Sequence, residues 1–232
     1  MSVLPGCHQR EHRSVLAASE RRLLIAIARR LPPAVNADHL SALGLAAMCA
    51  AGAGFAAIRV SGWGAAVVVL ALAANWFGDS LDGTVARVRG QERPRLGYYV
   101  DHVIDLAGSA ALFAGLACSG LMTPLLAVAV LAGYLLVSAE AYLATHAVGV
   151  FRMARFGLGP TELRLLLIAG ALWSVGHPVV LLPGYGPARL FDVGGLAALA
   201  GLTVVFVTAA VGHTRRLHRT EPRPAVPLRR VG

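Results

Sequence analysis

Four aspartates with helical spacing lie on either side of a short basic stretch in this sequence. Asp79 and Asp82 are three positions apart, and Asp101 and Asp105 are four apart, so each pair falls on one face of a helix. If the two helices form an antiparallel hairpin, the carboxylates face one another at similar depth. Facing carboxylates in a poorly hydrated place repel each other and cannot all stay ionised. The pattern therefore predicts a site that binds positive charge.

Divalent metal ions are the expected source of that charge. Two such ions balance four carboxylates, and ligation by oxygen alone favours Mg²⁺, with Mn²⁺ or Ca²⁺ as substitutes. Paired metals are typical of sites that transfer phosphate esters, because they hold both the attacking and the leaving oxygen. Gly83, Ala86 and Gly97 leave these helix faces without bulk, and Arg87 could pair with a phosphate bidentately. The alternative, carboxylates acting only as polar contacts between helices, is disfavoured by four of them on two faces.

The composition indicates a membrane protein. Of 232 residues, 56% are hydrophobic and 14% charged, which excludes an ordinary soluble domain and a disordered chain. A net charge of +9 would suggest nucleic acid as partner in a polar protein. Here all 21 basic residues are arginines clustered between apolar runs, so we expect no nucleic acid and a membrane instead. Three scattered cysteines argue against a disulfide framework.

The apolar runs predict an all-α integral membrane protein with six transmembrane helices. An amphipathic helix over residues 14–30, ended by Pro32 and Pro33, is expected to precede them at the membrane interface, with a loosely ordered basic arm as the alternative. No cleaved signal peptide is readable. The fifth span is short, and it ends at His177 and Pro178. The expected spans are 38–60, 63–89, 96–119, 124–149, 161–176 and 190–211.

The arginines also predict an orientation. With six spans the heavily basic segments all fall on one side, and Arg59 and Arg189 stand alone on the other. Because positive charge stays on the cytoplasmic side, both termini and the aspartates should face the cytoplasm, in the cytoplasmic membrane. We therefore expect three parts: an N-terminal cytoplasmic segment 1–36, a transmembrane domain 37–212 and a basic, proline-rich tail 213–232 near anionic lipid head groups.

The stretch that carries the aspartates resembles a family signature. Residues 79–105 read DSLDGTVARVRGQERPRLGYYVDHVID, which is similar to the pattern of the CDP-alcohol phosphotransferase family: DxxDGxxAR, a spacer of eight or nine residues, then GxxxDxxxD. Every fixed position is present, and the spacer between Arg87 and Gly97 is nine residues. Six spans after an interfacial helix, with the motif bridging the second and third, also match the family.

The resemblance implies a magnesium-dependent transfer in which an acceptor hydroxyl attacks a CDP-linked alcohol and CMP is released. Two Mg²⁺ ions, or Mn²⁺, would be held by the aspartates, and the last aspartate could instead act as the general base. The family also implies a homodimer. Carried onto this sequence, the metal ligands are Asp79, Asp82, Asp101 and Asp105, the catalytic residue is Asp105, and the nucleotide site is lined by Gly83, Ala86, Arg87 and Gly97.

The substrates are less narrowly defined. Most bacterial members use CDP-diacylglycerol and a small polar acceptor, and this is the expected reaction. A second branch moves phosphocholine or phosphoethanolamine to diacylglycerol, and His102 beside Asp101 is typical of its DHxxD form, although a packing role for this histidine is the alternative. Leu106 stands where phosphatidylglycerophosphate synthases tend to carry a lysine.

Side chains that could bind the acceptor lie on other predicted spans and loops. The alternatives are arginines that only fix topology and, for the glutamate, a polar contact within the bundle. The complete carboxylate set disfavours a non-catalytic relative, and its confinement to one hairpin disfavours a small transporter. The possible acceptor residues are Glu140, Arg152, Arg155 and Arg164.

Overall fold

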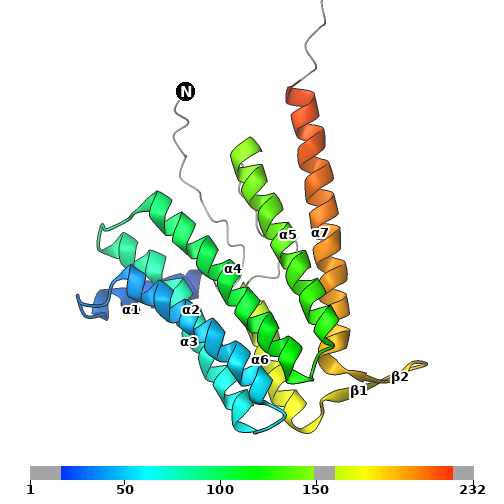
Figure 1. Ribbon diagram of the computed structural model, residues 1–232. Coiled ribbons are helices and arrows are strands. Elements are labelled where there is room, and N and C mark those ends of the chain that lie inside the picture. The colour runs from blue at the N-terminus through cyan, green and yellow to red at the C-terminus, as the bar shows by residue number, and fades with distance from the viewer. Residues whose placement is uncertain (1–16, 149–159, 222–232) are drawn as a thin grey trace, which may run out of the picture.

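The structure is a computed structural model that describes residues 17–148 and 160–221. Within these ranges the chain forms seven helices and a two-stranded hairpin (Figure 1). The helices are α1 (Ala17–Arg30), α2 (Ala37–Ala57), α3 (Trp63–Val88), α4 (Pro94–Ser119), α5 (Pro124–Val148), α6 (Pro160–Gly176) and α7 (Leu190–Thr220), and the strands are β1 (Val179–Leu182) and β2 (Gly186–Arg189).

The helices have the lengths that a membrane protein needs. Among the described helices, α2, α3, α4, α5 and α7 are long and apolar enough to cross a membrane. The prediction of a helical membrane protein is therefore confirmed by the length and composition of five helices. Helix α6 has 17 residues and is the shortest of the helices that follow α1. Helix α7 continues beyond the predicted end of its span at residue 211 and reaches Thr220.

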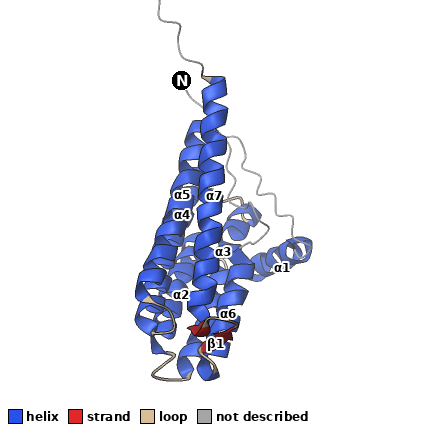
Figure 2. Ribbon diagram, turned by 90° about the vertical axis from the view of Figure 1, so that its right-hand side faces the viewer, coloured by secondary structure: helices blue, strands red, loops and turns tan. Residues whose placement is uncertain are grey.

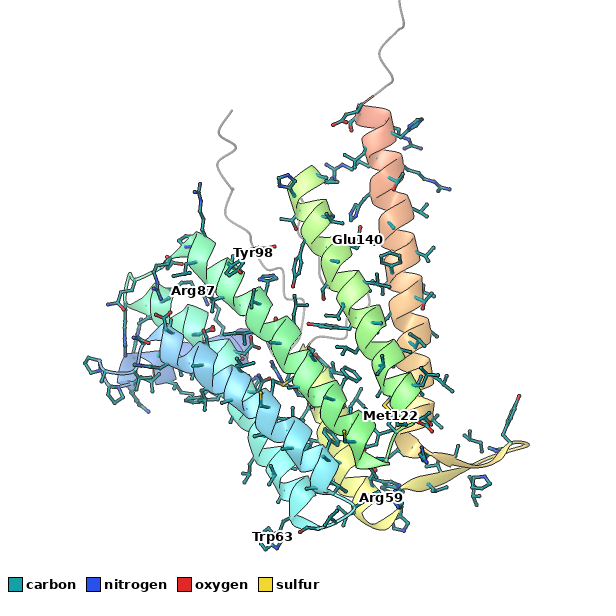
Figure 3. All side chains as sticks on the ribbon, in the orientation of Figure 1. Arg59, Trp63, Arg87, Tyr98, Met122 and Glu140 are labelled. Carbon is teal, nitrogen blue, oxygen red and sulfur yellow. The ribbon has the colours of Figure 1, made fainter. Side chains whose placement is uncertain are left out.

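The long helices run up and down and pack in two groups. Helices α2, α3 and α4 pack closely, α5 pairs with α7, and α6 lies against α3 (Figures 1 and 2). Helix α1 lies across the bundle, where Leu24 and Ala28 are buried against Leu81 and Val85 of α3. Figure 3 places Arg87 and Tyr98 at the end of the bundle opposite Arg59 and Trp63. The turn between α3 and α4 therefore lies at the same end of the bundle as α1.

Glycines allow the close packing of α2 with its neighbours. A Cβ atom on Gly115 of α4 would overlap the carbonyl group of Gly52 of α2. A Cβ atom on Gly78 of α3 would lie 2.6 Å from the carbonyl oxygen of Leu40. Side chains therefore cannot separate these backbones, and the helices meet at distances that only small residues permit.

The hairpin of β1 and β2 was not predicted. The two strands pair antiparallel, with Val179 opposite Arg189 and Leu182 opposite Gly186. Gly184 and Gly186 have φ of 82° and 84°, which places both in the left-handed region that glycine adopts without strain. A strand of four residues beside prolines gives too little alternation to be predicted from the sequence.

Replacing Gly115 by alanine tests the close packing of α2 and α4. The added methyl group meets backbone rather than a movable side chain, so we expect Gly115→Ala to lower the free energy of unfolding by roughly 1–3 kcal/mol. Equilibrium unfolding in mixed micelles measures the change. Gly201→Ala is the matched control, because a Cβ atom there has no neighbour within 4 Å. Equal stability of the two variants would contradict this description of the interface.

Candidate active site

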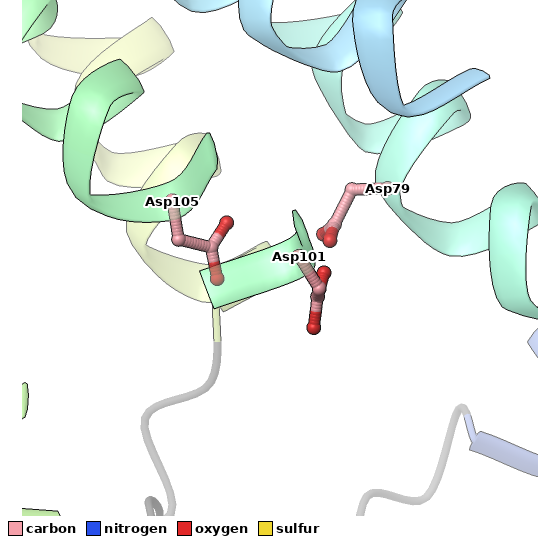
Figure 4. Close-up of side chains that lie close together, drawn as sticks. All are labelled: Asp79, Asp101 and Asp105. Atoms are coloured by element: carbon pink, nitrogen blue, oxygen red, sulfur yellow. The ribbon is translucent and has the colours of Figure 1, made fainter. Parts of the chain in front are cut away.

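The hairpin of α3 and α4 brings three of the predicted aspartates together. Asp79 on α3 faces Asp101 and Asp105 on α4 (Figure 4), and one carboxylate oxygen from each lies within 4.8 Å of the others. The helical spacing of four places Asp101 and Asp105 on one face of α4, and the antiparallel hairpin turns that face toward α3. The arrangement has the chemistry of a cation site, since its ligands are all oxygen.

The fourth aspartate lines the same cavity but is held differently. Asp82 is not part of the group of three. Its Oδ2 accepts a hydrogen bond from the hydroxyl of Ser41 on α2 at 2.7 Å, and its Oδ1 accepts one from the backbone N–H of Gly83 at 2.5 Å. The residues around this cavity are Ser41, Gly44, Asn75, Asp79, Asp82, Asp101, Ile104 and Asp105.

An arginine from α6 reaches the aspartates. Nη2 of Arg164 lies 2.6 Å from Oδ2 of Asp79, and Nε of Arg164 donates to Oδ1 of Asn75 at 2.8 Å. Asn75 is 6% exposed, and its Nδ2 donates to the carbonyl oxygen of Gly44 at 3.1 Å. Both ends of this amide are therefore used, and it links α2 and α6 beside the carboxylates. Arg164 carries positive charge into the site, as a cluster of carboxylates requires.

The expected nucleotide residues lie on the hairpin of α3 and α4, and none of them lines the cavity around the aspartates. Nη2 of Arg87 donates to Oγ1 of Thr84 at 3.2 Å. A Cβ atom on Gly83 would lie 3.2 Å from Nη1 of Arg87, so a larger residue at 83 would crowd the guanidinium. A Cβ atom on Gly97 would have no neighbour within 4 Å.

Ala86 lines a second cavity, of about 430 Å³, between the start of α2 and the turn after α3. Arg93 in this turn forms an ion pair with Asp38 at the start of α2. The hydrogen bond and the charge of Asp38 raise the pKa of the Arg93 guanidinium. Both side chains are more than half exposed, so the pair is screened by solvent and adds little to stability.

The four possible acceptor residues have different outcomes. Of the two that the structure describes, Arg164 is brought to the aspartates and Glu140 is not. Glu140 was expected to face the same cavity, but its Oε1 lies 2.6 Å from Nδ1 of His213 on α7, and it does not line that cavity. The predicted depth was a count along one helix, which does not define the face that points at the site. Arg152 and Arg155 lie outside the described residues.

His102 is packed into the bundle beside Asp101. His102 is 7% exposed, and its ring contacts the rings of Tyr98 and Tyr142. Its Nδ1 lies 2.6 Å from the carbonyl oxygen of Tyr98. Because Nδ1 faces a carbonyl oxygen, it carries the proton. The packing role considered for this histidine agrees with these contacts.

Comparison with known proteins decides the family. The sequence model of the CDP-alcohol phosphatidyltransferase family matches residues 37–212. The chain belongs to this family. It is 30% identical over 178 residues to the archaetidylinositol phosphate synthase of Methanothermobacter thermautotrophicus, an alignment that covers 72% of this chain and 84% of that protein. The predicted family and transferase class are thereby confirmed.

A solved structure agrees with the fold. The crystal structure of Mycobacterium tuberculosis phosphatidylinositol phosphate synthase with CDP-DAG bound matches with a TM-score of 0.55 and 24% identity. The match covers 88% of this chain and 100% of that chain. This CDP-alcohol phosphatidyltransferase therefore shares the fold of that synthase.

The residues present fit the divalent metal on which enzymes of this family generally depend. Three carboxylates from two helices offer oxygens close enough to share one ion, and Asp82 adds a fourth carboxylate to the same cavity. Such a ligand set suits hard cations, and it suits zinc or copper less well because it lacks nitrogen and sulfur.

Sequence reasoning missed Ser41 and Asn75. Asn75 lies one helical turn before Asp79 in an apolar helix, so a buried amide on the aspartate face was a readable signal. Ser41 carried no such signal, because serine is common in membrane helices and its partner lies 41 positions away. The packing of α2 on α3 is what brings Ser41 and Asp82 together.

A double-mutant cycle tests the link between Asn75 and Arg164. Asn75→Leu keeps the volume but leaves the Arg164 guanidinium and the Gly44 carbonyl without the amide, so we expect a loss of about 1–3 kcal/mol in unfolding free energy. Arg164→Leu removes the other partner. The double variant should lose clearly less than the sum of the two single losses, measured by unfolding in mixed micelles. Strict additivity would show that the two side chains do not depend on each other.

Proposed function

We propose that this enzyme transfers a phosphatidyl group from CDP-diacylglycerol to a hydroxyl group of a phosphorylated polyol of the inositol phosphate type, with release of CMP. The observation that carries the proposal is the group of Asp79, Asp101 and Asp105 within 4.8 Å, with Arg164 in contact with Asp79. The names of the two similar proteins support an inositol phosphate acceptor and, for the solved structure, a CDP-DAG donor.

The aspartates have two roles in the proposed reaction, metal binding and proton transfer. Asp79, Asp82 and Asp101 would hold Mg²⁺, for which Mn²⁺ could substitute, and two ions would balance the four carboxylates. Metal bound there would supply positive charge for the diphosphate and the reacting oxygens. Asp105 is a metal ligand or takes the proton of the acceptor hydroxyl. The hydroxyl oxygen bonds to the phosphorus that carries the diacylglycerol, the bond from this phosphorus to the CMP oxygen breaks, and CMP leaves.

Different residues bind the donor and the acceptor in the proposed reaction. Gly83, Ala86, Arg87 and Gly97 line the nucleotide site, where small residues leave room for the diphosphate and Arg87 donates to it. Arg164 binds the acceptor phosphate. A guanidinium has five N–H donors, and the contacts to Asn75 and Asp79 use two of its nitrogens, so Arg164 keeps donors for a phosphate.

The aminoalcohol reaction is not proposed. Its support in the sequence is His102, and this ring packs between Tyr98 and Tyr142. The contacts of His102 are those of a side chain that joins α4 to α5, and none of them favours an aminoalcohol substrate.

The membrane arrangement is part of the proposal. Six helices, α2 to α7, cross the cytoplasmic membrane, and local thinning of the bilayer accommodates the 17 residues of α6. Helix α1 lies at the interface, and the aspartates and both termini face the cytoplasm. Residues 37–212 form the catalytic domain between the segment 1–36 and the tail 213–232. Two copies form a homodimer through their membrane helices.

CMP release by the detergent-purified protein tests the function. With Mg²⁺, CDP-diacylglycerol and inositol phosphate, we expect turnover that requires the metal and that Asp105→Asn lowers by roughly 10²-fold or more. CDP-choline and CDP-ethanolamine with diacylglycerol serve as competing donors. Turnover only with these donors would move the enzyme to the aminoalcohol branch, and no metal-dependent CMP release from any donor would contradict the proposal.

Arg164 allows a sharper test of the acceptor. Losing a charge-assisted contact to phosphate should raise the KM of Arg164→Gln for inositol phosphate by roughly tenfold or more, with little change in the KM for CDP-diacylglycerol. Steady-state kinetics with each substrate varied in turn measures both values. Unphosphorylated inositol is the matched control, because its weaker use should not depend on Arg164. An equal rise in the KM of both acceptors would show that Arg164 does not bind the acceptor phosphate.

A further inference from the structure

Ser41 lies on α2, outside the two helices that carry the aspartates, and contacts Asp82. Its hydroxyl oxygen lies 2.7 Å from Oδ2 of Asp82 and 3.1 Å from the carbonyl oxygen of Ala37. A serine hydroxyl has one proton, so it can donate to only one of these oxygens at a time. The carboxylate is the shorter contact and the stronger acceptor. The hydroxyl is therefore directed at Asp82.

The packing of α2 on α3 makes this contact. The two helices run antiparallel (Figure 1), and their backbones meet at Gly44 and Gly78, where a Cβ atom on Gly78 would lie 3.0 Å from the backbone nitrogen of Gly44. Ser41 comes three residues before Gly44, and Asp82 comes four residues after Gly78. One helical turn beyond the crossing, the two side chains must therefore face each other.

The contact fixes the one aspartate that stands outside the group of three. Asp82 borders the same cavity as Asp79, Asp101 and Asp105, but its oxygens do not belong to their cluster. Each carboxylate oxygen has two lone pairs, so Asp82 can accept from Ser41 and from the N–H of Gly83 and still offer a ligand to a cation.

We propose that Ser41 is a positioning residue for metal binding, whose hydroxyl holds the carboxylate of Asp82 in the orientation in which it serves as a ligand. This inference rests on the proposed role of Asp82 as a metal ligand. Hydrogen bonds that orient ligand side chains commonly change metal affinity by 10- to 100-fold. Ser41 acts through Asp82 and needs no contact with either substrate.

Binding of Mn²⁺ to the purified full-length protein, without substrates, tests the inference. Electron paramagnetic resonance follows free Mn²⁺ during a titration and gives a Kd. We expect Ser41→Ala to raise the Kd by about tenfold, and Ser41→Thr, which restores the hydroxyl, to return it close to the wild-type value. Ser174→Ala is the matched control, because Ser174 is a buried serine on α6 that does not line the cavity.

Asp82→Asn distinguishes failure of this inference from failure of the proposed function. If Asp82→Asn weakens Mn²⁺ binding but Ser41→Ala does not, Ser41 has no positioning role, while the metal site stands. Equal weakening by Ser41→Ala and Ser41→Thr would show that packing rather than the hydroxyl decides, and would also overturn the inference. Unchanged binding in Asp82→Asn would overturn both the inference and the assignment of Asp82. Thermal unfolding of each variant checks that all are folded.

Discussion

Carboxylates held at close range inside a bundle of membrane helices are the constraint on which this structure depends. An ionised carboxylate in the membrane costs several kcal/mol unless it is paired or hydrated, and neighbouring carboxylates add mutual repulsion. The protein meets this cost with a guanidinium on Asp79, a hydroxyl and an amide N–H on Asp82, and a cavity that the acids share. A bound divalent cation would lower the cost further. The same demand for positive charge would be met by the proposed metal ions, through which the site would bind a diphosphate.

Close helix packing is what places these partners. Glycines on α2, α3 and α4 let the backbones approach, so that short side chains such as Ser41 and Asn75 reach across from one helix to the next. The short helix α6 lies against α3 and delivers Arg164. In lipid, packing and hydrogen bonds hold helices together, because apolar burial drives little association there. The polar contacts at the site therefore also stabilise the arrangement of α2, α3 and α6.

Much of this could be read from the sequence, for identifiable reasons. Apolar runs of a membrane-spanning length fix where helices lie, and the spacing of Asp101 and Asp105 fixes their common face. Arg164 was readable as a candidate site residue. Its contact with Asp79 and the contact of Ser41 with Asp82 were not, because they join residues far apart in the chain. Glu140 shows the same limit: its position along α5 was readable, but its partner His213 on α7 was not. The hairpin of β1 and β2 was missed because a short strand beside prolines gives almost no periodic signal.

In the proposed reaction, the aspartates of α3 and α4 bind divalent metal ions as one site. Counting the Mn²⁺ ions bound per chain, with electron paramagnetic resonance to detect magnetic coupling between them, tests this claim most directly. We expect two coupled ions per chain in the wild-type protein and loss of the coupling in Asp101→Asn. Binding of ions without coupling, or unchanged binding after this substitution, would contradict it.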